Sequence, residues 1–371
     1  MKLAFALFKY FPYGGLQRDC IKIAEECIKR GHSVDIFTLQ AEGELPDGIT
    51  QHLLPQKAQR NYKRYESFAT QVAQLVSHGQ YSGLIGFNKM PNLDVYYAAD
   101  PCFAAKVVAR NIFYRHAGRS RSFVAAEEAV FGAQSKTEIL LISAREQQIF
   151  SQLYQTDDKR MHLLPPGIQK DRLAGADYQQ RRTHKRHELG VDTPDIMLLM
   201  VGSGFKTKGL DRSLLAIAAL PEAVRKRVKL FVVGQDNIKP FKRMAKSLGL
   251  SEQFYFLGGR ADVADLLFAA DLLLHPAYRE NTGTVLLEAM AAQLPLLVSG
   301  VCGYSFHVAA AECGSVLHEP FSQQEMNAIL EQMLGSSQRE MWQENARKYI
   351  ANNDVLSMPQ RAVDIIEQVI S

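Results

Sequence analysis

Short apolar runs alternate with segments of helical periodicity along most of this chain, and this alternation restricts the fold more than any other feature of the sequence. Each run is only a few residues long, which is the length of a buried strand rather than of a buried helix. Strands that alternate with helices predict parallel βα units, in which helices cover both faces of a parallel sheet. The predicted fold class is therefore α/β.

The first half of the chain shows this pattern from its first residues. The apolar run at residues 2–8 predicts a buried strand rather than a leader peptide, because aromatic residues and a glycine pair follow it at once. Residues 16–30 have one apolar face and predict a helix, which Gly31 ends. Further strands are expected at 33–39, 83–87, 94–99 and 138–143, and helices at 65–78, 125–131 and 144–154.

The pattern breaks at residues 163–167, where two prolines and a glycine predict a hinge between domains. A polar helix is then expected at 181–188, and the βα pattern restarts. Strands are expected at 196–201, 229–233, 254–257, 272–275, 296–299 and 315–317, and three helices between 322 and 370. Since 371 residues exceed what one core usually holds, we expect two domains. They are residues 1–165 and 166–355, with a last helix, about 356–371, packed back on the first.

Composition excludes several protein classes. The hydrophobic content of 47% and the charged content of 22% are ordinary for a globular protein. No apolar segment approaches the roughly 20 residues that span a bilayer. The net charge of +4 is too small to predict a nucleic-acid partner. Five cysteines without a CxxC pair argue against a disulfide or metal framework and fit a reducing cytosol.

Basic residues gather in three clusters, at residues 57–64, 101–126 and 181–186. A solvated helix face explains each cluster as well as a binding surface does. The two clusters in the N-terminal half favour an anionic partner on that side. Residues 101–126 contain five Lys or Arg, no acid and several apolar side chains. This mixture predicts a patch at an anionic membrane surface, and a surface that holds only the phosphates of an acceptor is the alternative.

Two glycine-containing loops follow predicted strands and are candidates for phosphate binding. Gly14 and Gly15 stand at a strand-to-helix turn where backbone N–H groups can approach a phosphate, although an ordinary tight turn explains them equally well. The loop at residues 202–209 carries Lys206 and Lys208, which can cover a diphosphate or can be solvated surface lysines. The GxGxxG and GxxxxGK[ST] patterns are absent, which argues against an NAD enzyme and a Walker A loop.

The most informative segment is the strand–loop–helix unit predicted at residues 275–289. Its loop carries Glu280, and its helix places Glu288 in the second turn, where the carboxylate can accept hydrogen bonds from a ribose diol. Glu280 can hold hydroxyls of a sugar attached to a diphosphate. Free N–H groups at the start of the helix form an anion site, and they belong to Gly283, Thr284 and Val285. The alternative is that Glu288 is a solvated helix residue.

Together these segments resemble the signature of retaining glycosyltransferases of the GT-B fold, family 4. The Glu-x7-Glu spacing of Glu280 and Glu288 is the centre of the resemblance. Further matching segments are Gly14–Gly15, Val201–Gly202, Lys208–Gly209, Val233–Gly234 and Gly258–Arg260. Residues 10–19, 86–91, 164–168 and 301–304 are similar to lipopolysaccharide core glycosyltransferases that add the first hexose to an inner-core heptose, the glucosyltransferase I type. The resemblance covers essentially the whole chain.

The resemblance implies two Rossmann-like domains that face each other across a cleft, the N-terminal one for the acceptor and the C-terminal one for the nucleotide sugar. It implies retaining, metal-independent transfer of a hexose from a UDP-sugar to a heptose of the lipopolysaccharide inner core in a Gram-negative bacterium. The UDP-sugar is a co-substrate, and no cofactor is expected. We also expect a monomer in the cytoplasm, peripherally associated with the inner face of the cytoplasmic membrane.

The resemblance also implies roles for single residues. Glu280, Asp19 and Asp100 are the candidate catalytic residues, and the two aspartates approach the cleft from the N-terminal side. Glu288 would bind ribose and Arg260 would lie near the uracil. The expected contacts with the diphosphate and the donor sugar come from Gly14, Gly15, Arg172, Lys206, Lys208, Asn281, Thr282, Gly283, Thr284 and Val285.

Two departures from the family pattern affect the donor site. Asn281 and Thr282 stand where the similar glucosyltransferases carry small apolar residues, and Thr207–Lys208 stands where they carry an Arg-Lys pair. An N-acetylhexosamine therefore remains an alternative to glucose. Alternatives to the activity are a GT-B nucleotide-sugar epimerase, a glycosyltransferase for another glycolipid or polysaccharide, and a non-catalytic nucleotide-binding protein.

Overall fold

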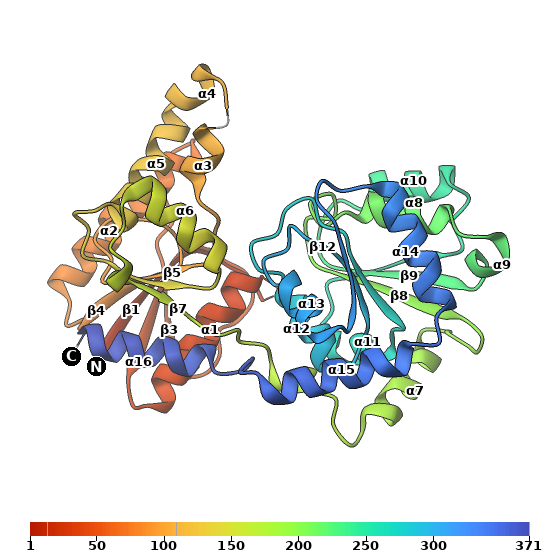
Figure 1. The fold of residues 1–371 in the computed structure, drawn as a ribbon. Coiled ribbons are helices and arrows are strands. Elements are labelled where there is room, and N and C mark those ends of the chain that lie inside the picture. Colours follow the sequence, from red (N-terminus) through yellow and green to blue (C-terminus); the bar gives the residue numbers. More distant parts are fainter. Residues whose placement is uncertain (13, 109, 371) are drawn as a thin grey trace. The chain divides into compact units, whose positions relative to one another are not determined.

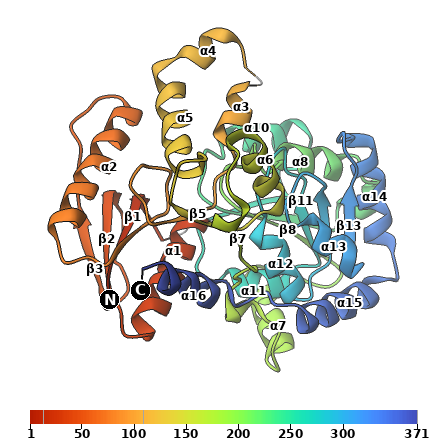
Figure 2. The same cartoon turned by 60° about the vertical axis from the view of Figure 1, so that its left-hand side comes forward.

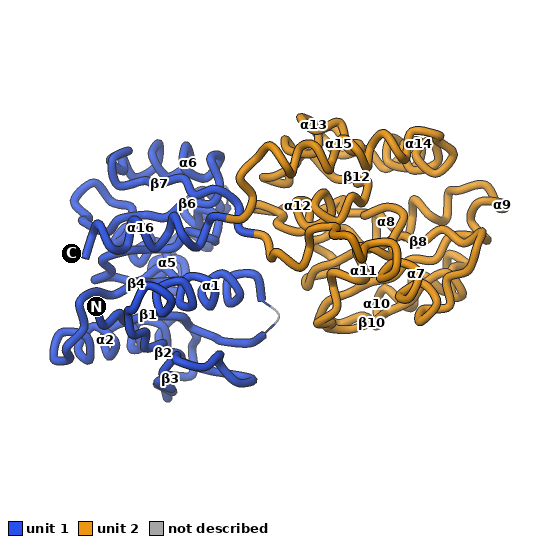
Figure 3. Tube along the Cα trace, turned by 90° about the horizontal axis from the view of Figure 1, so that it is seen from below, with its two compact units in different colours: residues 1–167, 357–371 blue, residues 168–356 orange. Residues whose placement is uncertain are grey.

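A computed structural model describes residues 1–12, 14–108 and 110–370 of the chain. The chain forms two compact units, residues 1–167 with 357–371, and residues 168–356 (Figure 3). The first unit thus ends at Gly167, close to the expected limit at residue 165, and it includes the last helix. Each unit contains one parallel sheet with helices on both faces, which is the GT-B architecture.

The sheet of the first unit has seven strands in the described part of the chain, all parallel. They are β1 (Lys2–Tyr10), β2 (Ser33–Ala41), β3 (Ile49–Leu53), β4 (Gly83–Gly86), β5 (Val95–Ala98), β6 (Glu138–Leu141) and β7 (Met161–Leu163). Their order across the sheet is β3-β2-β1-β4-β5-β6-β7. Because β1 and β4 are neighbours and the chain winds outward from them in opposite directions, their carboxyl ends meet at a topological switch point, where ligands bind in such sheets.

Helices cover both faces of this sheet. They are α1 (Gly15–Lys29), α2 (Asn61–His78), α3 (Phe103–Val108), α4 (Ile112–His116), α5 (Gly118–Phe131), α6 (Ala144–Tyr154) and α16 (Met358–Ile370). One apolar cluster joins α1 and α16 to the sheet, and another joins α2, α5 and α6 to the opposite face. The arm, defined as residues 103–131 of α3, α4 and α5, extends beyond the sheet with α4 at its tip (Figures 1 and 2).

The second unit repeats this construction. Its strands are β8 (Ile196–Val201), β9 (Val228–Val233), β10 (Phe254–Gly258), β11 (Leu272–His275), β12 (Leu296–Ser299) and β13 (Gly314–Leu317). They form a parallel sheet in the order β10-β9-β8-β11-β12-β13. The α-helices are α7 (Tyr178–Glu188), α8 (Leu210–Ala218), α9 (Glu222–Arg225), α10 (Lys239–Ser247), α11 (Val263–Ala269), α12 (Thr284–Ala291), α13 (Ser305–Ala311), α14 (Gln323–Gly335) and α15 (Arg339–Asn352).

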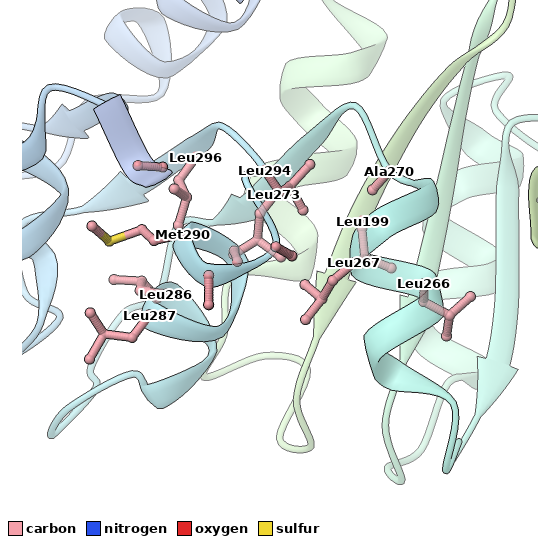
Figure 4. Packing of buried hydrophobic residues seen from close by; sticks show 14 of the residues in the cluster. Leu199, Leu266, Leu267, Ala270, Leu273, Leu286, Leu287, Met290, Leu294 and Leu296 are labelled. Atoms are coloured by element: carbon pink, nitrogen blue, oxygen red, sulfur yellow. The ribbon is translucent and has the colours of Figure 1, made fainter. Parts of the chain in front are cut away.

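Two apolar cores hold the second unit together, one on each face of its sheet. One core contains buried residues of α11, α12, α13 and α15, and the other contains residues of α8, α10 and α14. Figure 4 shows Leu286, Leu287 and Met290 of α12 in the same cluster as Leu273 of β11. The packing of α12 against the sheet fixes the position of the loop that precedes this helix.

The structure contains elements that the sequence pattern did not predict. The strand β3 was missed because it is an edge strand of sequence ITQHL, which lacks an apolar run. The strand β7 has only three residues, and α3 and α4 are short helices of six and five residues. Strands 196–201, 272–275 and 296–299 and the helix 144–154 were predicted with the bounds observed.

Two general expectations concern cysteines and membrane spans. Cys20, Cys27, Cys102, Cys302 and Cys313 are all free thiols and all buried, as expected for small core residues. Among the helices of the described residues, none combines the length and the apolar character needed to cross a membrane.

Candidate functional site

The loop between β11 and α12, residues 276–283, lies at the carboxyl end of the central strands of the second sheet. Gly283 has a φ of +84° and forms the N-cap of α12, a conformation that residues with a side chain rarely adopt. The helix therefore begins directly after the loop. Its first N–H groups, at Thr284 and Val285, follow Gly283 as predicted.

Side chains from neighbouring elements hold the backbone of this loop. Ser299 Oγ, at the end of β12, donates to the carbonyl of Ala277 at 2.8 Å. Arg212 Nη1, in α8, donates to the carbonyls of Pro276 and Ala277 at 3.0 Å each. The Arg212 guanidinium also lies 3.6 Å from the ring centroid of Tyr278. Two elements, β12 and α8, therefore fix the first half of the loop.

The Glu280 side chain is held by two nitrogen donors. Lys208, in the loop after β8, forms an ion pair with Glu280 Oε2. His275 Nε2 lies 3.3 Å from the same oxygen. Burial and the Lys208 charge lower the pKa of His275 to about 3, so its ring is neutral. A β-bridge joins Glu280 to Cys302, and burial raises the pKa of that thiol to about 11.

Glu288, in the second turn of α12, and Arg172 form a second pair. Both residues are 3% exposed, and Arg172 Nε lies 3.6 Å from Glu288 Oε1. Arg172 also donates to Asp171 Oδ2 at 2.7 Å. The alternative of a solvated Glu288 is therefore wrong, because α12 turns this carboxylate into the protein. The structure brings together two residues that stand far apart in the sequence.

The predicted donor residues Asn281 and Thr282 pack against the loop that follows β12. Tyr304 N donates to the Thr282 carbonyl at 2.8 Å, and Thr282 is 8% exposed. A Cβ atom at Gly303 would collide with the carbonyl oxygen of Asn281, so only glycine allows this close approach.

Lys206 and Arg260 have other partners. Lys206 is exposed and pairs with Asp211 Oδ2 at 2.5 Å, on the outer side of the loop near Tyr278. Arg260 donates to both carboxylate oxygens of Asp262 at 2.7 and 2.6 Å. Of the two lysines in the loop at residues 202–209, the structure therefore brings only Lys208 to Glu280.

The first unit places its candidate residues around its own sheet. Gly14 is the N-cap of α1, and the space beside Gly15 is open. Tyr13 of this loop lies outside the described residues. Tyr97 Oη, in β5, donates to Asp19 Oδ2 at 2.8 Å. Asp100, after β5, is solvent-exposed, yet partial desolvation by its surroundings raises its pKa.

The third basic cluster, residues 181–186 of α7, is taken up in ion pairs within the second unit. Arg182 and Arg186 contact Asp271 at 2.6 and 3.0 Å, and Arg182 also donates to carbonyls at the end of α11. Arg181 pairs with Asp265, and Lys185 with Asp262. The expectation of a solvated face or an anion-binding surface is wrong here, because the acids that neutralise the cluster lie far along the chain.

The arm combines an exposed tip with a buried root. Phe113 and Ile112 in α4 are 85% and 63% exposed. At the root, the fully buried Glu127 accepts hydrogen bonds from Lys89 Nζ at 2.5 Å and Tyr154 Oη at 2.8 Å. It also accepts from two backbone N–H groups at the start of α3. One carboxylate therefore ties the arm to the rest of the unit.

The N-terminal part of α2 lies beside the arm, so the first two basic clusters are neighbours. Tyr65 of α2 and Phe123 of α5 have ring centroids 6.2 Å apart. Arg60, the N-cap of α2, and Lys63 of α2 are exposed, and Arg119 and Arg121 are exposed on α5. The two clusters together form a basic surface around the arm.

Comparison with known proteins relates this geometry to a family. Residues 181–349 match the family of glycosyl transferases group 1. The lipopolysaccharide glucosyltransferase WaaG of Escherichia coli (strain K12) is 43% identical over 368 residues, which cover 99% of this chain and 98% of that protein. The chain belongs to this glycosyltransferase family. A D-inositol 3-phosphate glycosyltransferase of Stackebrandtia nassauensis is 25% identical, over 82% of this chain and 75% of that protein.

Solved structures of glycosyltransferases share the fold of this chain. The crystal structure of WaaG, a glycosyltransferase involved in lipopolysaccharide biosynthesis, has a TM-score of 0.95 and covers 98% of this chain and 99% of that one. The Anabaena protein HepE in complex with UDP and glucose has a TM-score of 0.77 at 19% identity, covering 99% of this chain and 100% of that one, and shows the shared fold alone.

His275, Arg212 and Ser299 contact the loop at residues 276–283 or its Glu280 side chain, and none of these contacts was predicted. His275 was read only as the end of a strand, although a polar residue after Leu272–Leu274 was a visible signal. Arg212 gave no signal, because only the fold brings α8 beside the loop. Among the described residues, no group of three or more His, Cys, Asp or Glu could hold a metal ion. Metal independence stays a prediction.

Proposed function

We propose that this glycosyltransferase transfers a hexose from a UDP-sugar to a heptose of the lipopolysaccharide inner core. The observation that carries the proposal is the placement of two carboxylate–cation pairs beside the N-terminus of α12, Lys208 with Glu280 and Arg172 with Glu288. A nucleoside diphosphate sugar needs cations and N–H donors for its phosphates and carboxylates for its hydroxyls. The 43% identity to WaaG supports the acceptor.

The proposed reaction is a metal-independent displacement that retains the anomeric configuration. The bond between C1 of the sugar and the β-phosphate oxygen breaks, and the acceptor hydroxyl bonds to C1 from the same face. Lys208, Arg172 and the N–H groups at the start of α12 stabilise the negative charge that develops on the departing UDP. The acceptor proton passes to the departing phosphate, so Asp19 and Asp100 need not act as bases. Glu280 orients the sugar and stabilises positive charge at C1.

We propose UDP-glucose as the first donor to test, since the E. coli relative is a glucosyltransferase. Asn281 and Thr282 pack at the predicted sugar position, and a buried polar group rejects a substrate that leaves it unpaired. These two residues therefore decide between glucose and an N-acetylhexosamine. Replacing both by alanine is expected to change the relative rates with the two donors, and an unchanged donor profile contradicts this assignment.

A screen of UDP-sugars with purified lipopolysaccharide truncated at the inner-core heptoses tests the proposed function. The expected result is one preferred donor, an α-linked product and full activity in EDTA. Formation of an epimerised UDP-sugar without acceptor identifies an epimerase instead. Transfer to other glycolipids but not to this acceptor contradicts the proposed substrate.

The arm is proposed to bind the inner face of the cytoplasmic membrane, where a lipid-linked acceptor is presented. Its tip exposes Phe113 and Ile112, and the surrounding basic residues suit anionic lipid headgroups. Each basic residue near such a surface contributes about 1 kcal/mol.

Co-sedimentation with vesicles tests this part of the proposal. Binding to vesicles that contain anionic lipid is expected, and salt and neutralisation of Arg115, Arg119 and Arg121 should weaken it. No binding at low salt, together with full activity on a soluble acceptor, leaves a surface that contacts only the phosphates of the acceptor.

A further inference from the structure

His275 is a buried polar residue at the end of an otherwise apolar strand. It follows Leu272–Leu274 in β11 and is 0% exposed. A leucine at this position would continue the apolar pattern and fill a similar volume. Among the described residues, its side chain forms a hydrogen bond only with Glu280, with Nε2 3.3 Å from Oε2.

The geometry determines which ring nitrogen carries the proton. A carboxylate only accepts hydrogen bonds, so Nε2 must be the donor to Glu280. Burial and the charge of Lys208 lower the pKa of His275 to about 3, so the ring carries one proton at neutral pH. Nδ1 is therefore a bare acceptor, and it has no hydrogen-bond partner among the described residues.

An unpaired buried acceptor costs free energy, and a leucine would remove that cost. The cost is offset only by the hydrogen bond from Nε2 to a charged carboxylate, which is stronger than a bond between neutral groups. Packing alone therefore does not explain a histidine at this position. The side chain acts on Glu280.

We propose that His275 is a positioning residue that holds the Glu280 carboxylate in the orientation required for the donor sugar. Lys208 contacts the same oxygen, Oε2, from another loop, so two donors on Oε2 define the direction of the carboxylate. The inference rests on the proposed function, in which Glu280 contacts the sugar. The other titratable groups near this site are the thiol of Cys302, whose backbone forms a β-bridge with that of Glu280, and Glu319, whose charge acts on that thiol.

Two variants separate positioning from packing. His275→Leu removes the donor, whereas His275→Gln keeps an N–H donor of similar reach. His162→Leu is the matched control, because His162 Nε2 also lies 2.7 Å from a glutamate, Glu138, but in the first unit. For each protein, the measurements are thermal unfolding, the Kd values of UDP and UDP-glucose by calorimetry, and the pH dependence of kcat.

His275→Leu is expected to lower kcat about tenfold, since a small misorientation of a contact group is costly. It should leave the Kd of UDP unchanged, because the nucleotide does not contact Glu280. It should bring the Kd of UDP-glucose closer to that of UDP, because the sugar does contact Glu280. The acid limb of kcat should move to higher pH, since a carboxylate that loses a donor is protonated more readily. His275→Gln should restore most of these properties, and His162→Leu should change none.

Three results overturn the inference. The first is a His275→Leu protein with an unchanged pH profile and an unchanged ratio of the two Kd values. The second is an equal loss in His275→Leu and His275→Gln that follows only their thermal stability. The third is a weaker Kd for UDP itself. Failure of the proposed function has a different signature, in which the unaltered protein turns over no UDP-sugar with the acceptor, and the Kd ratio still tests His275.

Discussion

The Glu280 loop and the arm are both insertions after strands, yet they are built in opposite ways. The loop at residues 276–283 is short and is held by Arg212 and Ser299, and its carboxylate is paired. The arm at residues 103–131 is long, and its tip at Phe113 is 85% exposed. Its root, at Glu127, is fully buried.

This difference matches the two tasks proposed for these regions. A site that stabilises a developing charge must be rigid before the substrate arrives, because reorganisation would consume the stabilisation. A surface that meets a lipid-linked acceptor must instead expose apolar and basic groups that would be excluded from a packed core. Substitutions in the loop should therefore affect chemistry, and substitutions at the tip of the arm should affect only association.

The root of the arm should show the largest effect, and on stability rather than on chemistry. Glu127→Ala leaves the Lys89 ammonium, which is largely buried, without its carboxylate partner, and this is expected to lower the free energy of unfolding by about 3–5 kcal/mol. The exposed neighbour Glu128 is the matched control. Glu128→Ala should change the free energy of unfolding by less than about 0.5 kcal/mol. Denaturant unfolding measures both, and equal effects would show that the root is not the anchor.

In the Glu280 loop region, Lys208→Ala is expected to lower kcat/KM about 100-fold, which is the scale for losing one preorganised charge contact. Lys206→Ala should lower it less, because Lys206 is exposed and pairs with Asp211. Steady-state kinetics with UDP-glucose measure both variants. A larger loss in Lys206→Ala would mean that the wrong lysine has been assigned to the phosphate.

Glu288→Ala is expected to weaken the binding of UDP by about 1.5–3 kcal/mol, the range for hydrogen bonds to a charged group. The carboxylate is buried beside Arg172, so the variant should also be checked for thermal stability. Calorimetry with UDP measures the Kd of the nucleotide without a contribution from the sugar. An unchanged Kd in a folded variant would contradict the assignment of Glu288 to the ribose.

The smallest effect on stability is expected at the tip of the arm. Phe113→Ser should change the free energy of unfolding by less than about 0.5 kcal/mol, because its side chain is exposed. The same variant should bind anionic vesicles more weakly while keeping its kcat on a soluble acceptor. A clear loss of stability would show that the tip packs against another part of the protein.

The sequence predicted the regular parts of the fold well because the periodicity of apolar residues and the presence of turn residues are local signals. The strand–loop–helix unit around Glu280 and Glu288 was located from spacing and from Gly283 alone. Resemblance to a family implied separate roles for Arg172 at the diphosphate and Glu288 at the ribose, but not their pairing. The contact of His275 with Glu280 was not predicted either. The partners of α7 were also missed, because side chains that meet across elements leave no local pattern.

The last helix, α16, completes the first unit although almost the whole second unit is synthesised before it. Met358, Ala362, Val363 and Ile366 of α16 are buried in the core that also contains α1, and Arg30 contacts Asp364 and Glu367. The nascent first unit therefore keeps an uncovered apolar face until α16 has been synthesised. A ribosome that stops shortly before residue 358 releases a chain with this face exposed, which cellular proteases and chaperones recognise. The packing of this thirteen-residue helix thus reports whether synthesis has passed residue 358.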